Sequence, residues 1–595
     1  MAKRNAGRLL ALVAGCVSCA GAPARAWGAP RGAPAAPPAG IDASAVLPAD
    51  RMARWNPGIL ADGQLRLPLG PDRLPVRTRA CARLAASSWG NGAADATAGI
   101  QKALDACPAG QVVQLSAGDY RITDSLRITR GIVLRGQGPE RTRLRMPFGT
   151  NAAVIAVGTR WFKFTQSVDL AADAARGSFS ATLASDPGLR AGELVAVDEL
   201  ADPAVSAWGR KSPPGDPSHA WFTRPERPVG QVLEVAAVRG RTVTFTTPFH
   251  IGFRTAQRAQ LSRFSQAEGG PPVPSVKYAG IEDLYVSGGG DGNLRLLAAS
   301  ESWIRNVESD AQVGEAVAIA GSFRCVVRDS YFHSTRAPQP GGGGYGISFS
   351  LYSADNLVEN NISWNMNKVM VMRASGGGNV IGYNYLEDGW ISYATGWVEA
   401  GANASHMTTP HYELFEGNEA FNFDGDNTWG NAVYITVFRN HFTGKRRSAP
   451  PLRLADRQNR RAVGLNAGHW WYSFIGNVLG YEGMSPAPAR AFTYEGSYPW
   501  DEDPVPMWKL GYDPENWSAR ADPKVLSTVL RDGNYDYVTR EVHWAGGVPK
   551  ALPDSLYLAR KPAFFGDAAW PWVDPAGAVK LQLLPARARF DALHR

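Results

Sequence analysis

An apolar residue followed three positions later by Asn recurs through the second half of the chain. The recurring polar positions are Asn306, Ser330, Asn361, Asn384, Asn418, Asn440 and Asn477, and the apolar residues before them are Trp303, Val327, Val358, Ile381, Phe415, Val437 and Phe474. Successive positions are 22 to 37 residues apart, and a period in this range marks a repeat architecture. Short β-rich units with a stacked Asn at each corner predict a parallel β-helix, because stacked amides satisfy backbone groups of the turns.

A second pattern near the N-terminus predicts a helix followed by short strands. Ile100, Ala103, Leu104 and Cys107 fall on one helical face, and Asp95 is placed to cap that helix. The expected strands are Val112–Leu115, Tyr120–Ile122, Leu126–Ile128 and Ile132–Leu134. We expect the helix to cover the open end of the solenoid, where an uncovered edge strand would invite pairing with another chain.

Residues 95–104 (DATAGIQKAL), 112–122 (VVQLSAGDYRI) and 134–138 (LRGQG) resemble the N-terminal segment of the pectate-lyase-like superfamily. The resemblance implies an all-β fold, a right-handed parallel β-helix with an N-terminal capping helix. It does not imply one reaction, since that superfamily includes lyases, hydrolases, epimerases and phage tailspikes.

Changes in pattern divide the chain into six segments. They are 1–26 (signal peptide), 27–87 (lead-in), 88–159 (entry module with the cap helix), 160–262 (small inserted β module), 263–483 (main β-helix with loop insertions) and 484–595 (C-terminal coils and cap). The inserted module breaks the rhythm of the coils, and its simplest interpretation is a structural decoration.

The first residues have the pattern of an export signal. Lys3, Arg4 and Arg8 precede the apolar run 9–13, and residues 24–26 form an A-x-A cleavage site. Lipoprotein processing at Cys16 is the alternative. We expect a secreted or periplasmic protein, with no integral membrane segment because the apolar run is far too short to span a bilayer.

Composition narrows the function classes. The 64 Gly and 42 Pro suit tight turns, and the 19 Trp suit stacking on sugar faces. The net charge of +8 falls to +4 without the four cations of residues 1–26, which is weak support for nucleic-acid binding. We expect a polysaccharide partner, no nucleic acid and a monomer. Cys81 and Cys107 are candidates for a disulfide, Cys325 is expected to be a buried thiol, and no metal-ligand spacing occurs.

Unequal repeat lengths indicate where a binding site lies. Three steps are short, and the other three carry extra residues within 336–346, 390–411 and 444–466. If these loops leave the same turn, they line one flank of the solenoid, where solenoid proteins build binding surfaces.

The chemistry near these loops favours glycoside hydrolysis. Coils are about 4.8 Å apart, so acids at similar offsets on neighbouring coils can form a glycosidase pair. We predict Asp388 paired with Asp424 or Asp426 as the acid/base set, with Glu387 in reserve. The predicted substrate-binding residues are Trp390, Trp397, His406, Trp429 and Trp470, with His411 as a second orienting imidazole.

Two other functions remain open. A uronate lyase acting by β-elimination would use Lys368, Arg373 and His411, with Ca²⁺ at Asp424 and Asp426 to neutralise charge; otherwise no cofactor is required. A non-catalytic glycan-binding surface protein is the third. Plainer interpretations stand beside these: residues 424–427 as a turn, the two His as structural groups, and Glu413, Glu416 and Glu419 as outward and exposed.

Overall fold

The computed structural model describes residues 43–60, 69–209, 213–336, 343–390, 401–445, 461–484, 495–496, 507–512, 522–575 and 580–594. The predicted signal peptide, Cys16 and Trp397 lie outside these ranges. Within them, no helix has the length and apolar character needed to cross a membrane.

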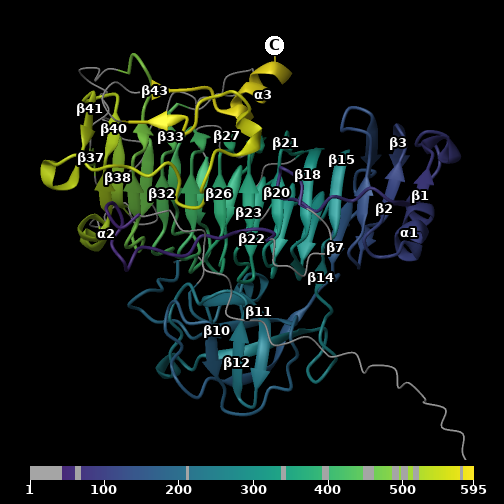
Figure 1. Cartoon of the computed structure of the whole chain (residues 1–595), viewed down its shortest axis with the longest axis horizontal. Coiled ribbons are helices and arrows are strands. Elements are labelled where there is room, and N and C mark those ends of the chain that lie inside the picture. The colour runs from purple at the N-terminus through teal and green to yellow at the C-terminus, as the bar shows by residue number, and fades with distance from the viewer. Residues whose placement is uncertain are drawn as a thin grey trace, which may run out of the picture. The chain divides into compact units, whose positions relative to one another are not determined.

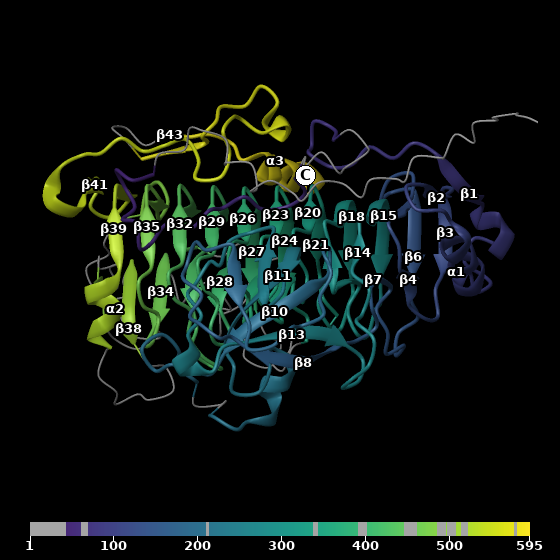
Figure 2. The same ribbon diagram turned by 60° about the horizontal axis from the view of Figure 1, so that its bottom comes forward.

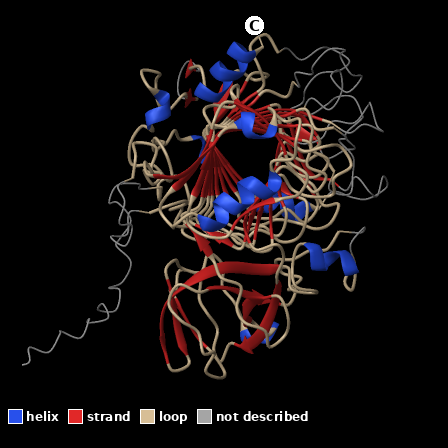
Figure 3. Cartoon of the chain, turned by 90° about the vertical axis from the view of Figure 1, so that its right-hand side faces the viewer, coloured by secondary structure: helices blue, strands red, loops and turns tan. Residues whose placement is uncertain are grey.

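Each coil contributes one strand to each of three parallel ladders, which confirms the parallel β-helix (Figures 1 and 3). The first ladder contains β2 (Val112–Leu115), β5 (Val133–Arg135), β15 (Gly280–Ser287), β18 (Trp303–Asp310), β20 (Val326–Arg328), β23 (Leu357–Glu359), β26 (Val380–Gly382), β29 (Leu414–Glu416), β32 (Thr436–Phe438), β35 (Ser473–Ile475) and β39 (Leu530–Asp532). β1 (Ala80–Leu84) pairs with β2 at its start.

The second ladder follows the first in each coil and belongs to the same 22-stranded sheet. It contains β3 (Gly118–Arg121), β6 (Thr142–Arg145), the second halves of β15 and β18, β21 (Tyr331–His333), β24 (Ile362–Met366), β27 (Tyr385–Gly389), β30 (Glu419–Ala420), β33 (His441–Phe442), β36 (Val478–Leu479) and β40 (Asn534–Asp536). β41 (Glu541–His543) closes it in the antiparallel sense.

The third ladder forms a separate 11-stranded sheet. It contains β4 (Leu126–Ile128), β7 (Ile155–Gly158), β16 (Leu294–Leu297), β19 (Val317–Ala320), β22 (Ile347–Ser350), β25 (Met370–Met372), β28 (Ala402–Ser405), β31 (Phe423–Gly425), β34 (Val463–Asn466), β38 (Trp508–Tyr512) and β37 (Glu495–Gly496).

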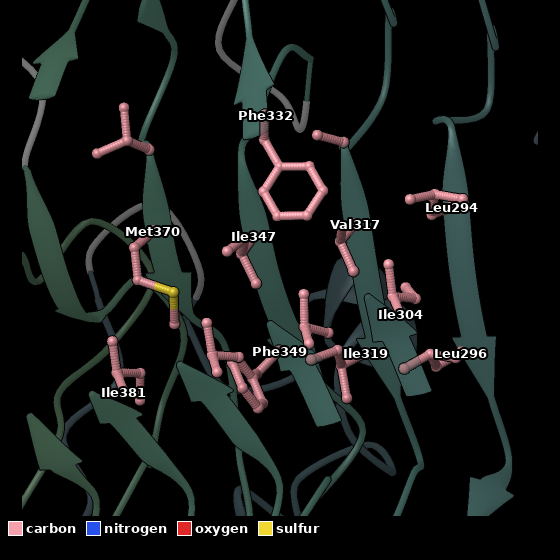
Figure 4. Close-up of a cluster of buried hydrophobic side chains, with 14 of the residues drawn as sticks. Leu294, Leu296, Ile304, Val317, Ile319, Phe332, Ile347, Phe349, Met370 and Ile381 are labelled. Carbon is pink, nitrogen blue, oxygen red and sulfur yellow. The ribbon is translucent and has the colours of Figure 1, made fainter. Parts of the chain in front are cut away.

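Side chains alternate between the interior and the outer face of this third sheet, since a strand has a period of two. Leu294, Val317, Ile347 and Met370 occupy equivalent positions on neighbouring coils and point inward (Figure 4). The next position along each strand faces outward, and Asp424 on β31 lies in that outward column with Asn403 on its neighbour. The register of the ladder therefore determines which polar side chains are neighbours on the outer face of this sheet.

The predicted Asn ladder is present from Asn361 onward. Asn361 Nδ2 donates to Asn384 Oδ1 at 3.0 Å, and Asn384 Nδ2 donates to Asn418 Oδ1 at 3.0 Å. Each acceptor also takes the backbone N–H of the preceding Asn. The ladder runs on through Asn440 and Asn477 to Asn534, a member that the sequence pattern missed.

The ladder differs from the prediction at its start. Ser330 does occupy the column, because its Oγ accepts from Val307 N at 3.1 Å. The column position one coil earlier is therefore Val307, and Asn306 lies one residue before it. Asn306 is exposed, has a φ of 51° and bonds Asp283 Oδ1 at 2.8 Å. Trp303 and Asn306 have the spacing of the repeat by coincidence, because both lie one residue before the positions that the repeat occupies on the neighbouring coil.

The expected N-terminal helix is present. Helix α1 (Thr97–Ala106) buries Ile100 and Leu104; its N-cap residue is Ala96 rather than Asp95, although Asp95 Oδ1 accepts from Thr97 N at 3.0 Å. Cys81 and Cys107 form a disulfide. Cys325 is a buried free thiol, as predicted.

The inserted region has its own six-stranded antiparallel sheet and core. Its strands are β8 (Lys163–Asp169), β9 (Ser180–Thr182), β10 (Leu194–Glu199), β11 (Val229–Arg239), β12 (Thr242–Phe245) and β13 (Gln260–Ser265). Tyr352, in the turn after β22, anchors it: its carbonyl accepts from Val232 N at 2.9 Å. These strands fall near the predicted 160–262, while the six-part division itself stays a prediction.

The C-terminal segment packs on the outer face of the large sheet (Figure 2). Helix α3 (Pro585–Leu593) places Phe590 against Trp364 and Tyr385, with ring centroids 5.5 Å and 4.8 Å apart. Trp572 donates from Nε1 to Gly417 O at 2.6 Å. Helix α2 (Pro523–Thr528) lies beside β38. This cover buries outer-face side chains such as Tyr383, Tyr385 and Phe438.

Three acids expected to be exposed are buried instead: Glu413, Glu416 and Glu419. Glu413 is the last residue of a second, shorter column of stacked polar side chains, Asn356–Asn379–Glu413. Its two carboxylate oxygens accept hydrogen bonds from the backbone and side chain of Asn379. Glu416 accepts from the backbone N–H of Leu556 in the C-terminal segment at 2.8 Å. The exposure prediction was wrong because the sequence does not reveal which strand faces a later segment covers.

Candidate functional site

The three long loops leave the same turn of the solenoid, as predicted. Residues 334–346 connect β21 to β22, residues 390–401 connect β27 to β28, and residues 443–462 connect β33 to β34. Each connection therefore runs from the second ladder to the third. The described ends of these connections lie at the starts of the third-ladder strands β22, β28 and β34.

A network of ionisable side chains lies on that outer face. We call it the charged cluster; it consists of Glu315, Lys368, Arg373, His406, Asp424, Asp426 and Arg461. Its members come from five of six successive coils, those that contain β19, β25, β28, β31 and β34. The sheet register brings them together, since residues on one face of neighbouring coils are about 4.8 Å apart.

Asp426 follows β31 directly and has three side-chain partners, besides the backbone N–H of Thr428. His406 Nδ1 lies 3.0 Å from each of its carboxylate oxygens, Lys368 Nζ lies 3.3 Å from Oδ2, and Asn403 Nδ2 donates to Oδ2 at 2.5 Å. Burial works to raise the pKa of Asp426, but the charges of His406 and Lys368 outweigh it and hold the pKa well below its usual range. Asp426 is therefore a stable carboxylate.

Asp424 sits two residues earlier in a different environment. Arg461 donates to it through Nε at 3.0 Å and Nη2 at 2.7 Å, and Asn422 Nδ2 donates to Oδ2 at 2.9 Å. Burial raises the pKa of Asp424 despite the opposing charge of Arg461, and the nearby charge of Asp426 raises it further. Two neighbouring carboxyls thus have pKa values pushed in opposite directions.

Two glycines leave room for this pair. A Cβ at Gly464, beside Asp424 in the register, would lie 2.2 Å from Asp424 Oδ1 and 2.3 Å from Arg461 Nε. A Cβ at Gly425, between the two acids, would lie 2.4 Å from His469 Cδ2. Neither space can hold a side chain, so both positions require Gly for packing reasons.

The cluster extends along the sheet through Tyr345 and Arg373. Tyr345 Oη lies 3.2 Å from His406 Nε2. Arg373 donates from Nη2 to Glu315 Oε1 at 2.6 Å, and its guanidinium lies 5.4 Å from the Tyr345 ring and 5.0 Å from the ring of Phe222. Phe222 belongs to the inserted module, so that module reaches the cluster.

The structure places Asp388 and Glu387 elsewhere. Both lie on β27 of the second ladder, in the 22-stranded sheet, whereas Asp424 lies on β31 of the third ladder. Glu387 pairs in register with Trp364, on the face that α3 covers. The expected stacking of Asp388 on Asp424 is wrong, because loops of unequal length intervene and offsets from the Asn no longer match. The register neighbours of Asp424 are Asn403 and Gly464.

His411 and Trp390 are held by local contacts outside the cluster. His411 is buried, its Nδ1 lies 3.0 Å from Thr409 O, and burial lowers its pKa to about 4. Trp390 Nε1 donates to Asn365 Oδ1 at 2.8 Å. The plainer structural interpretation fits His411, whereas His406 belongs to the cluster.

The other described tryptophans predicted to bind substrate, Trp470 and Trp429, contact different parts of the protein. Trp470 is half-buried, donates from Nε1 to Asp522 Oδ2 at 2.9 Å, and carries Lys524 Nζ 3.4 Å from its ring centre. Lys524 thus occupies a ring face that sugar stacking would need. Trp429 is half-buried next to Gly430, which pairs with Trp208 of the inserted module.

The donor set does not fit Ca²⁺. The carboxylate oxygens of Asp424 and Asp426 face Arg461, Lys368 and His406, which are cationic or hydrogen-bond-donating partners, whereas Ca²⁺ takes six to eight oxygen ligands. Across the described ranges, no group of three His, Cys, Asp or Glu is arranged to hold a metal ion.

A cavity of about 700 Å³ lies away from the cluster, at the corner between the first and second ladders. Its polar lining includes Asp283, Arg305 and Asp329. Arg305 pairs with Asp283, and Arg328 pairs with Asp329. Arg305 also pairs with Asp72, so its contacts link two coils and the lead-in segment. We place the functional site at the charged cluster.

Sequence reasoning missed Arg461, Tyr345, Asn403 and Phe222. Arg461 and Tyr345 each lie two residues before a strand of the third ladder, at the end of a long loop. A rule that aligned the ends of the loops rather than their beginnings would have found both.

No protein-family model matches the chain, and no curated protein matches it. Similar solved structures include the Pseudomonas phage phi297 tailspike gp61 (TM-score 0.47, 14% identity, 76% of this chain and 75% of that one) and the tailspike gp49 of Pseudomonas phage LKA1 (0.42, 13%, 77% and 80%). A third is polygalacturonase from Erwinia carotovora ssp. carotovora (0.30, 11%, 75% and 97%).

All three TM-scores are below 0.5, so the fold statement rests on the strand ladders of this chain itself. They define a parallel β-helix.

Proposed function

We propose that this chain is a secreted carbohydrate-active enzyme that cleaves a polysaccharide by glycoside hydrolysis at the charged cluster. One observation carries the proposal: Asp424 and Asp426 lie together on the outer face of the third ladder, and their surroundings push their pKa values apart. Such a divided pair is how one site supplies an acid and a base at the same pH.

The roles follow from the partners. Asp424, whose pKa burial raises, is suited to donate a proton to the leaving glycosidic oxygen. Asp426, kept ionised by His406 and Lys368, is suited to activate water or to attack the sugar. We propose that His406 and Lys368 act as positioning residues, because they reach the reaction through Asp426.

The disulfide between Cys81 and Cys107 supports export, because such bonds persist in oxidising compartments. We also propose that the protein is a monomer, which sedimentation at several concentrations would test; a concentration-dependent dimer would contradict it.

The test is purified protein against alginate, polygalacturonate, a neutral β-glucan and chitin, with reducing ends and ultraviolet absorption followed together. Wild type should release reducing ends without unsaturated products. Asp424→Asn and Asp426→Asn should each lower kcat by about 100-fold or more. Asp186→Asn, an exposed acid of the inserted module, is the matched control. Wild-type turnover in both cluster variants, with unchanged circular dichroism, would overturn the assignment.

The variant Asp388→Asn distinguishes the proposed pair, Asp424 and Asp426, from the pair predicted by coil spacing, which includes Asp388. Since Asp388 lies on the other sheet, we expect its variant to keep turnover if it stays folded.

One observation favours uronate β-elimination as the second candidate. Tyr345, His406 and Asp426 form a hydrogen-bonded line, with 3.2 Å and 3.0 Å separations, beside the cations Lys368 and Arg373. Such a line can withdraw a proton while the cations offset the developing charge. Unsaturated products absorbing in the ultraviolet would select this reaction, and binding without any product would select the non-catalytic alternative.

A further inference from the structure

We infer that the inserted module extends the proposed glycan-binding surface, with Trp221 as a platform on which a sugar ring of the substrate stacks. The inference rests on the proposed polysaccharide-cleaving site and adds a subsite to it.

The segment that carries Trp221 is firmly held. Its short 3₁₀ helix, Pro217–Trp221, begins at Asp216, whose side chain accepts from Ser218 N at 2.8 Å. His219 is fully buried and stacks on Trp208, with ring centroids 3.9 Å apart and an interplanar angle of 8°. These two contacts hold the backbone before Trp221 in place.

The same segment is bonded to the solenoid immediately after Trp221. Leu351 N, in the turn after β22, donates to Phe222 O at 3.0 Å, and Arg224 N donates to Tyr352 Oη at 2.9 Å. A Cβ at Gly230 would lie 2.5 Å from the Tyr352 ring, which shows how closely the module and the solenoid pack. The module therefore holds a defined position against the third ladder.

Two ring contacts link Trp221 to the charged cluster. The Phe222 ring lies 5.0 Å from the Arg373 guanidinium, and the Trp221 ring centroid lies 6.4 Å from that of Phe222. Yet Trp221 is 70% exposed, although its neighbours Phe222 and His219 are packed. A large apolar ring held in water beside a polar site offers an amphipathic surface of the kind that binds sugar faces.

The position of Trp221 relative to the charged cluster indicates which kind of ligand would bind there. The chain enters the third ladder from the second at the starts of strands such as β25 and β34, and the inserted module is bonded to turns at the opposite ends of the third-ladder strands. The charged cluster lies between them. A chain of sugar units crossing the cluster would meet Trp221 at the module edge, so the platform serves a polymeric glycan rather than a single sugar.

The test uses the whole protein and a matched control. Wild type, Trp221→Ala and Trp161→Ala are run in native gels containing alginate, polygalacturonate, β-glucan or chitin derivatives of good solubility. Trp161 is 45% exposed on the same module, and its neighbour Phe162 packs against Phe164 and Phe264 inside that module. We expect Trp221→Ala to weaken retardation, or raise KM, about tenfold, the effect of losing one aromatic contact. Trp161→Ala should match wild type.

The outcomes separate this inference from the proposed function. If Trp221→Ala is retarded as strongly as wild type, or if no glycan retards wild type, the platform is overturned. If Trp221→Ala loses retardation while no variant or wild type releases products, the platform stands and hydrolysis fails. If Asp426→Asn loses turnover but Trp221→Ala keeps its KM, hydrolysis stands and the platform fails.

Discussion

His406 Nδ1 lies 3.0 Å from both carboxylate oxygens of Asp426, across neighbouring coils of the third ladder. The imidazole and Lys368 keep Asp426 ionised in a site where burial works the other way. These two partners therefore favour the ionised form of Asp426. The pH dependence of activity tests this interaction.

Replacing His406 should shift the acidic limb of the pH–rate profile. The folded-state pKa of Asp426 lies well below its ordinary value, so the carboxylate persists until the pH is very low. His406→Ala removes one stabilising partner and should raise that pKa, so activity should fall at a higher pH than in wild type. His333→Ala, which removes a His–Glu pair on the second ladder, is the control. An unmoved acidic limb would show that His406 does not hold Asp426.

Gly464 should be intolerant of any side chain. Ala at this position would place a Cβ 2.2 Å from Asp424 Oδ1 and force apart the Asp424–Arg461 pair. We expect Gly464→Ala to lower kcat by about tenfold or more. Gly252→Ala is the control, because its Cβ would meet atoms only at 3.6 Å or beyond. Equal kcat values for the two variants would contradict the crowded geometry.

Glu413 should make the protein less stable as the pH rises. Burial raises its pKa from 4.5 to about 8, so the folded state holds a proton that the unfolded state has lost between these values. Its contribution to stability is present below about pH 4.5 and disappears as pH rises through about 8. Relative to Glu413→Gln, wild type should lose up to a few kcal/mol between pH 5 and pH 9. Chemical denaturation at both pH values measures this difference, and a constant difference would refute it.

The Asn ladder should be worth more than any isolated surface Asn. Asn418 is fully buried, donates to Ile381 O at 2.8 Å and accepts two bonds from Asn384. Asn418→Ala leaves these groups without partners, which costs about 1–3 kcal/mol for each buried group left unsatisfied. Asn306→Gly is the control, since Asn306 is exposed and Gly suits its φ of 51°. A similar loss of unfolding free energy in both variants would argue against a structural ladder.

Several features of the fold were readable from sequence because they are local or strictly periodic. The cap helix follows from the spacing of Ile100 and Leu104, and the ladder follows from Asn positions that repeat once per coil. Loop placement was also readable, since a longer step between two ladder positions must be accommodated in one turn. By contrast, Glu413 and Glu416 were misplaced because other coils and the C-terminal segment bury them.

The candidate site divides in the same way. The sequence by itself determined a parallel β-helix and the turn that carries the loops, whereas acid chemistry at residues 424–427 is its prediction. Only the tertiary structure decided that Asp426 faces His406 and Lys368, that Asp424 faces Arg461, and that Asp388 lies on another sheet. The physical reason is that loops of unequal length separate the second ladder from the third, so lateral partners are set by backbone pairing between coils and not by distance along the chain.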